Sequence, residues 1–213
     1  MSYDFAVFAG GRVMFFSSKS TKPDLTASNN KLASPDVPIS QQQSDTSEGA
    51  DLDPDELERR GVLAKHALAS LGSIVSIMMR SPNYHKNTLR DLAQYVVPAV
   101  QTAQFSVAEV RSKKTGAIEP VAMILWATVS KEIDERLTSK PSHPIQIEVS
   151  EWKSGDCPWL IDAVGPPEIL ARMIRELLED PFKGKTIKTN TIGKNGEVIL
   201  RQFNEASFEK TVG

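Results

Sequence analysis

The sequence predicts an α+β fold in which helices flank a central, mostly antiparallel sheet. Two observations lead to this prediction. The composition, 40% hydrophobic and 24% charged over 213 residues, is that of a globular protein with about one domain. The segments with strand and helix patterns follow one another in runs, whereas they alternate strictly in parallel folds. We therefore expect residues 53–213 to form one folded domain, preceded by a largely disordered segment over residues 1–52.

The N-terminal segment divides into an apolar stretch and a polar stretch. Phe5–Phe16 is apolar, but Asp4 precedes it and Arg12 interrupts it, unlike a secretory signal, and it is too short to span a bilayer. We interpret it as an isolated apolar segment or a short strand. Residues 17–50 are rich in Ser, Thr, Asn, Gln, Asp and Pro. Such a composition buries too little apolar surface to offset the entropy of ordering, so we expect disorder there.

Two helices are expected next. Asp53-Pro54-Asp55-Glu56 places an N-cap acid, a proline at the first helical position and a Glu at the third, which is the spacing of a capping box. Apolar residues recur at helical spacing over Leu63–Met78, and Pro82 predicts an end near residue 80. A second helix is expected to open at Thr88, with Asp91 three residues on, and to end or kink at Pro98.

From Gln104 onward the hydrophobic pattern becomes that of strands. Gln104–Arg111 alternates, residues 113–119 have turn composition, and Pro120–Val129 is almost wholly apolar, which together indicate a hairpin. The later segments indicate, in order, a short helix capped by its first residue, two strands, an amphipathic helix and the two strands of a closing hairpin: Ser130–Leu137, Ile145–Val149, Trp159–Val164, Pro167–Asp180, Lys185–Ile192 and Val198–Phe203.

Charge and motif content exclude several functional classes. The formal net charge is −2, which does not favour nucleic acid as a partner. Cys157 is the single cysteine, so no intrachain disulfide can form, and a reducing, cytoplasmic location is expected. The three histidines, His66, His85 and His143, have no metal-ligand spacing, and the chain has no glycine-rich phosphate loop. We expect neither a bound metal nor a membrane span.

Two residues are candidates for chemistry. His85 lies in the loop between the first two helices, and the pKa of an imidazole suits a general base near neutral pH; a lone loop histidine is more often a solvated surface residue. Asp162 interrupts the apolar run Trp159–Val164, where an ionised carboxylate is costly unless it is paired. It could face the open side of a strand or bond a backbone amide. Alternatively, it could orient a histidine and stabilise its imidazolium.

Several motifs, in the same order along about 135 residues from Leu68 to Phe203, carry a family resemblance. They are Ser81-Pro82 with the following His85, Pro98-Ala99 with Gln104-Phe105, Pro120-Val121-Ala122 with Trp126, and Ser154-Gly155-Asp156 with Trp159 and Ile161-Asp162. In these the chain resembles the toxin-activating lysine acyltransferases of bacterial RTX toxin systems. The last motif is the most specific.

The resemblance implies a fold similar to that of GNAT acyltransferases and transfer of a fatty acyl group from acyl carrier protein to internal lysines of an RTX-type protoxin. It implies His85 and Asp162 as the catalytic pair, with His85 as the base and Asp162 holding it. It implies acyl carrier protein and the protoxin as partners, no permanently bound cofactor, and a possible homodimer. A cluster of basic residues would suit the acidic carrier protein, although it could equally be a solvated hairpin face: Lys183, Lys185, Lys188, Lys194 and Arg201.

The chain departs from the family pattern at two points. The family has one residue between Ser-Pro and the histidine, whereas Asn83 and Tyr84 stand there in this chain, so Tyr84 is a rival occupant of the histidine's place. Ala163 stands where a tryptophan commonly follows the Ile-Asp pair. Two alternatives therefore remain open: a non-catalytic, chaperone-like relative that binds its toxin, and a GNAT-type enzyme that uses acyl-CoA. The glycine-rich pyrophosphate signature of the second is not visible.

Overall fold

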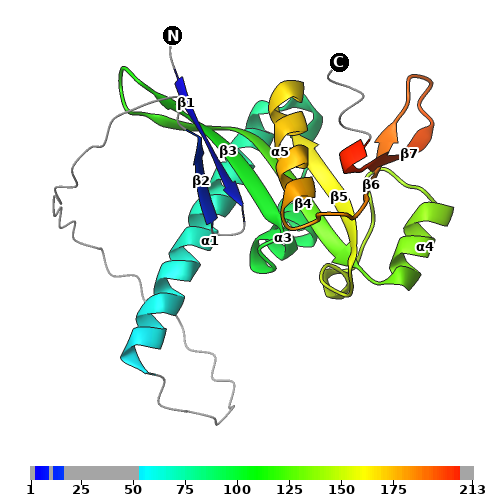
Figure 1. Cartoon of the computed structure of the whole chain (residues 1–213), viewed down its shortest axis with the longest axis horizontal. Coiled ribbons are helices and arrows are strands. Elements are labelled where there is room, and N and C mark those ends of the chain that lie inside the picture. Colours follow the sequence, from blue (N-terminus) through cyan, green and yellow to red (C-terminus); the bar gives the residue numbers. More distant parts are fainter. Residues whose placement is uncertain (1–2, 10–11, 17–52, 207–213) are drawn as a thin grey trace.

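The computed structural model describes residues 3–9, 12–16 and 53–206, and it confirms the α+β fold class. Seven strands form one sheet in the order β2-β1-β3-β4-β5-β6-β7, and every neighbouring pair is antiparallel except β5 with β6 (Figure 1). The strands are β1 (Tyr3–Ala9), β2 (Arg12–Phe16), β3 (Phe105–Ser112), β4 (Ile118–Val129), β5 (Cys157–Val164), β6 (Ile187–Ile192) and β7 (Val198–Phe203). Residues 17–52, for which disorder was predicted, lie outside the described residues.

The N-terminal apolar stretch belongs to this sheet. β1 and β2 form a hairpin, and β1 pairs with β3 from Tyr3 opposite Ser112 to Ala9 opposite Ser106. The interpretation as a short strand is confirmed, and the interpretation as an isolated segment is wrong. The pairing partner of β1 lies about a hundred residues along the chain, which local composition cannot reveal.

Helices cover both faces of the sheet. α1 (Pro54–Arg80) and α3 (Val97–Gln101) pack on one face, and α5 (Pro167–Glu179) packs on the other (Figure 1). β4 supplies both cores by alternation: Met123 and Leu125 join the cluster under α1, while Ile124 and Trp126 join the cluster under α5. A central strand buried on both faces explains why Pro120–Val129 is almost wholly apolar.

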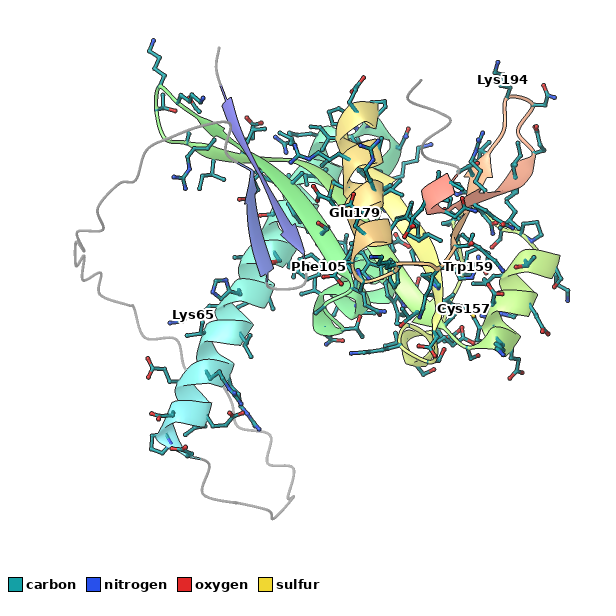
Figure 2. All side chains as sticks on the ribbon, in the orientation of Figure 1. Lys65, Phe105, Cys157, Trp159, Glu179 and Lys194 are labelled. Atoms are coloured by element: carbon teal, nitrogen blue, oxygen red, sulfur yellow. The ribbon has the colours of Figure 1, made fainter. Side chains whose placement is uncertain are left out.

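α1 is anchored at its C-terminal end only. Ile74, Ile77 and Met78 are buried in the core, whereas Leu57 and Leu63, in the half that projects from the sheet, are more than half exposed (Figures 1 and 2). By length and composition α1 is the one described helix that could cross a membrane, a test that core helices of soluble proteins also pass. Asp53 is the N-cap of α1 and Pro54 is its first residue, as predicted. The Asp53 carboxylate accepts from the Asp55 amide and not from the Glu56 amide, so the reciprocal capping box expected there is wrong.

The second helix is capped as predicted but does not end at Pro98. The Thr88 and Asp91 side chains each accept a hydrogen bond from the other residue's amide, forming the capping box of α2 (Leu89–Asp91). A wider π-helical turn over Leu92–Val96 follows, and the helix then continues through Pro98 as α3. A π turn relieves the i→i−4 bonding that a proline prevents. The predicted end at Pro98 is therefore wrong, because the helix continues through this proline to Gln101.

The other predicted elements are confirmed except one. The hairpin β3–β4, the amphipathic α5, β5 and the closing hairpin β6–β7 all form, as does α4 (Lys131–Ser139), whose first turn Ser130 caps by accepting from the Ile133 amide. The strand predicted over Ile145–Val149 is wrong. That segment packs Ile145 and Ile147 into the cluster under α1, but no described strand pairs with its backbone.

β5 and β6 pair only at their beginning. Trp159 opposite Lys188 is the single paired position between them. Asp134 of α4 connects the two strands at this position through its side chain. Asp134 accepts from Trp159 Nε1 over 2.8 Å and from Lys188 Nζ over 2.7 Å. The segment that follows α4 returns along β6, where Ser142 and His143 both bond Asn190.

Candidate active site

A β-bulge in β5 determines the direction of Asp162. Leu125 of β4 pairs with Asp162, but the next residue, Trp126, pairs with Leu160, so Ile161 is an extra residue in β5. Asp162 therefore shares the face of Leu125, beneath α1. Without the bulge, strict alternation from Trp159 would turn Asp162 toward α5. Bulges commonly re-aim side chains beside functional sites.

Asp162 is a carboxylate in an apolar setting with two hydrogen bonds. Its Oδ1 accepts from the Tyr84 hydroxyl over 2.6 Å and from the Ala163 amide over 2.8 Å. Oδ2 has no hydrogen-bond partner within residues 53–206. Burial raises the pKa of Asp162, and the bonds from Tyr84 and Ala163 and the nearby charge of His143 counteract that rise in pKa.

Tyr84 reaches Asp162 from the loop that follows α1. Pro82 ends α1 and begins a single 3-10 turn over Pro82–Tyr84, which directs the phenol toward β5. Burial and the neighbouring Asp162 carboxylate raise the pKa of Tyr84 well above its usual range. The phenol is consequently neutral at physiological pH and acts as a hydrogen-bond donor. Tyr84 was predicted only as a rival occupant of the histidine's place, and it holds the bond to Asp162 that was expected of His85.

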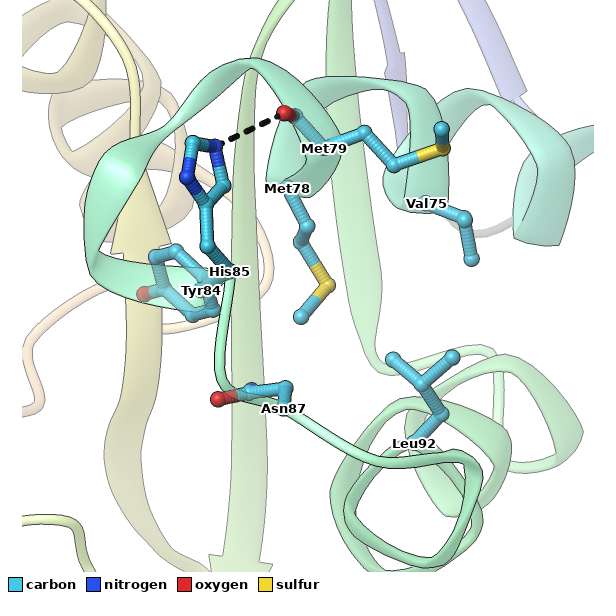
Figure 3. A pocket seen from close by; sticks show the side chains of 7 residues that line it. All are labelled: Val75, Met78, Met79, Tyr84, His85, Asn87 and Leu92. Atoms are coloured by element: carbon cyan, nitrogen blue, oxygen red, sulfur yellow. Dashed lines mark hydrogen bonds between the residues drawn. The ribbon is translucent and has the colours of Figure 1, made fainter.

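His85 points elsewhere. Its Nε2 lies 3.2 Å from the Met79 carbonyl oxygen, on the side of the loop away from the Tyr84 hydroxyl (Figure 3). Because a carbonyl only accepts, this geometry places the proton of the neutral ring on Nε2. The expectation that Asp162 holds the imidazole of His85 is therefore wrong for this structure. The catalytic roles of the two residues stay predictions.

A cavity of about 330 Å³ opens beside these loop residues. Figure 3 shows the imidazole of His85 and the side chain of Asn87 at its edge, with the thioethers of Met78 and Met79 on the α1 side. Most of its lining is apolar: Val75, Met78, Met79 and Leu92, with Tyr84, His85 and Asn87 as the polar members. Methionine side chains adapt to irregular apolar ligands.

The Ser-Gly-Asp motif is structural in its first two residues. The Ser154 hydroxyl accepts from the Ser130 amide over 2.9 Å and donates to the Glu151 carbonyl, which fixes the start of α4. A Cβ on Gly155 would lie 2.6 Å from Ser130 Cα, so only glycine fits this close approach of two backbones. Asp156 has a side chain that is 97% exposed and lies 3.8 Å from Lys185 Nζ. Within the described residues, the hydrogen-bond partners of Asp162 are Tyr84 and Ala163 and none of these three.

The remaining candidates from the sequence are either hydrogen-bonded within the fold or exposed. Lys188 forms an ion pair with Asp134. Lys185 donates to the Asp156 carbonyl, and Arg201 donates to the Thr191 hydroxyl. Lys194 is exposed at the tip of the β6–β7 hairpin (Figure 2). Cys157 is a free, half-buried thiol. In the described part of the chain, no three His, Cys, Asp or Glu side chains are grouped to hold a metal ion.

One histidine near Asp162 was not predicted to be functional. His143 lies 58 residues after His85 in sequence, but its charge lowers the pKa of Asp162, which places the two within electrostatic reach. No sequence signal marks it, since its position depends on the return of the 140–148 segment along β6.

Comparison with known proteins places this chain in a family. Residues 64–203 match the model of the RTX toxin acyltransferase family. A leukotoxin-activating lysine acyltransferase of a Pasteurella haemolytica-like species is 28% identical over 59% of this chain and 70% of its own length. A protein-lysine myristoyltransferase of Kingella kingae is 26% identical over 61% and 74%. An uncharacterised protein of Synechocystis is 24% identical over 64% and 88%.

Proposed function

Because this chain belongs to the RTX toxin acyltransferase family, we propose that it transfers a fatty acyl group from acyl carrier protein to internal lysines of an RTX-type protoxin. Acyl transfer to a protein lysine is what the family and the names of the relatives support. We add acyl carrier protein as the donor and the protoxin as the acceptor. A cytoplasmic location, in which acyl carrier protein and a newly made protoxin meet, belongs to it as well.

The single observation that carries the proposal is the setting of Asp162. The bulge at Ile161 turns this carboxylate to the face where the loop after α1 ends, and burial disfavours its ionised form unless a cation or donor approaches. The free oxygen Oδ2 is the natural place for such an approach. A lysine ammonium, or an imidazolium formed after proton transfer, would supply the missing positive charge.

The apolar cavity supports a fatty acyl donor. It adjoins Tyr84 and His85, so an acyl chain lying among Val75, Met78 and Leu92 would place its thioester at the polar edge. The donor would be held without a resident cofactor. Exposed Lys183 and Lys194 remain available to an acidic carrier protein, whereas Lys188 is bound within the fold.

The experiment is an acyl transfer assay with the full-length chain. It uses acyl carrier protein loaded with a labelled acyl group and a large RTX-type protoxin encoded beside this protein, with acyl-CoA tested in parallel. Label on a protoxin lysine that requires acyl carrier protein supports the proposal. Label from acyl-CoA alone would assign the donor differently. No label from either donor, with the folded chain present, would reject the enzyme activity.

The catalytic pair His85 and Asp162 is tested in the same assay. Asp162→Asn keeps the shape and removes the charge, and His85→Asn removes the imidazole from the loop. If His85 is the base, it must leave the Met79 carbonyl during the reaction, since its Nε2 is bonded there. Transfer by His85→Asn at the parent rate would remove His85 from the mechanism without affecting the proposed function.

One observation favours a second candidate function, binding of the toxin without catalysis. A neutral phenol, that of Tyr84, holds Asp162 where a titrating imidazole was expected. Such a chain could still bind its protoxin as a chaperone. Binding measured by calorimetry that survives the double change His85→Asn and Asp162→Asn, together with no detectable acyl transfer by the parent, would favour this candidate.

A further inference from the structure

The proposed reaction needs a proton acceptor that the Tyr84 phenol cannot provide. A lysine side chain is an ammonium near neutral pH and must lose protons before and during amide formation. The Tyr84 hydroxyl already donates to Asp162, and its raised pKa keeps it protonated. A group that accepts a proton near neutral pH must therefore come from elsewhere.

His143 is fixed in the orientation that such a group requires. Its Nδ1 lies 3.1 Å from the carbonyl oxygen of Asn190, so Nδ1 carries the proton of the neutral ring and Nε2 has the free lone pair. The Asn190 side chain, 2% exposed, donates back to the Ser142 carbonyl over 3.2 Å. Asn190 of β6 thus fixes both the imidazole ring of His143 and the backbone of the residue before it. Nε2 has no hydrogen-bond partner within the described range 53–206.

The fold brings this ring to the same site as Asp162. Asn190 lies two residues beyond the Trp159–Lys188 pair on β6, and Ile161, the neighbour of Asp162, lies two residues beyond it on β5. Ile145, two residues after His143, is buried in the cluster beneath α1 that also contains Ile161. Burial raises the pKa of Asp162, and the charge that His143 carries when it is protonated partly counteracts that rise.

We infer that Nε2 of His143 is the general base of the acyl transfer and that Asp162 stabilises the imidazolium which forms. This inference rests on the proposed function. The lysine Nζ attacks the thioester carbonyl carbon, the N–C bond forms, and the C–S bond breaks. The nucleophile is the neutral lysine amine, formed when the ammonium has released its first proton to solvent. His143 takes the second proton, which Nζ loses as the amide forms, and returns it to the departing thiolate, so the base is regenerated and the products are an amide and a thiol. The ring is solvent-exposed, which suits a lysine carried on another protein.

His143→Asn is the decisive variant, because the asparagine amide can still donate to the Asn190 carbonyl while the base is absent. We expect transfer to fall by about 100-fold or more, since a general base typically contributes about 10²–10⁴-fold. His66→Asn, on the projecting half of α1, is the matched control and should leave the rate unchanged. In His143→Ala, imidazole added to the solution should restore part of the rate, which a merely unfolded variant would not allow.

The outcomes separate the two proposals. If the parent protein transfers no acyl group, the proposed function fails. If the parent is active and His143→Asn retains its rate within twofold, the role of His143 is rejected. Loss of activity in His143→Ala that imidazole does not restore also rejects it. Loss in His85→Asn with full activity in His143→Asn would assign the base to His85.

Discussion

The Tyr84 hydroxyl donates to Asp162 Oδ1 over 2.6 Å and so joins the loop after α1 to the middle of β5. This bond links residues 78 positions apart, across the face of the sheet that α1 covers. The bond offsets part of the free-energy cost of burying the Asp162 carboxylate among apolar side chains. Removing it should therefore change both the stability of the protein and the pKa of Asp162.

Tyr84→Phe is expected to lower the free energy of unfolding by about 2 kcal/mol at pH 7, as for loss of a hydrogen bond to a charged group. The pKa of Asp162 should rise further, because the Tyr84 bond counteracts the effect of burial on that pKa. Urea unfolding at pH 7 measures the first effect. Tyr95→Phe is the matched control, since its hydroxyl bonds the exposed Asn87. An equal loss in the two variants would contradict the special role of Tyr84.

Asp162→Asn is expected to abolish acyl transfer and yet to stabilise the protein at pH 7 by about 1 kcal/mol. The folded-state pKa of Asp162 is raised, so the ionised carboxylate costs free energy above that pKa and costs nothing below the unfolded value, about 3.9. The gain from Asn should therefore disappear as the pH falls to 4. Thermal melts of both proteins from pH 4 to 8 measure it, and a constant difference would contradict burial as the cause.

Gly155→Ala is expected to destabilise the protein by about 1–3 kcal/mol, since the added Cβ would meet Ser130 Cα at 2.6 Å and backbone must shift. Gly72→Ala in α1 is the matched control. Its Cβ would meet no atom within 4 Å, and alanine should stabilise the helix by about 0.5–1 kcal/mol. Opposite signs in chemical unfolding would support the close approach at Gly155, and tolerance of both changes would refute it.

Asp134→Ala is expected to cost about 2 kcal/mol, as for loss of a hydrogen-bond acceptor by a part-buried charged group. The change leaves the Lys188 ammonium and the Trp159 indole N–H without their shared acceptor, in a part-buried setting. Glu135→Ala, an exposed acid on the same helix, should change stability by less than about 0.5 kcal/mol. A difference below 1 kcal/mol between the two variants would show that the bridge is incidental.

Sequence patterns identified the elements better than they identified the site. Asp162 was predictable because a charge inside an apolar strand is visible in one dimension. Its direction was not, because the extra residue Ile161 is defined by pairing with β4. His85 was predicted from its place after Ser81-Pro82, but the 3-10 turn there presents Tyr84 to the sheet. A one-residue offset in a tight turn exchanges one side chain for its neighbour.

The other misjudged segments have similar causes. Ile145–Val149 alternates as a strand does, but its side chains Ile145 and Ile147 pack into a core while its backbone pairs with no described strand. Pro98 has the usual mark of a helix end, and a π turn lets the helix pass it. His143 carries no local signal. Its position relative to Asp162 depends on tertiary contacts, among them the bonds of Ser142 and His143 to Asn190.

The single paired position between β5 and β6 has a consequence for how the molecule opens. β1 to β5 are joined by long antiparallel ladders, whereas the β6–β7 hairpin is joined to them by one pair and the Asp134 bridge. Amide protons of β6 and β7 should therefore exchange with deuterium through a separate, lower-energy opening than those of β3 and β4. His143, bonded to β6, would move with that hairpin, so breathing of the sheet would alter its separation from Asp162.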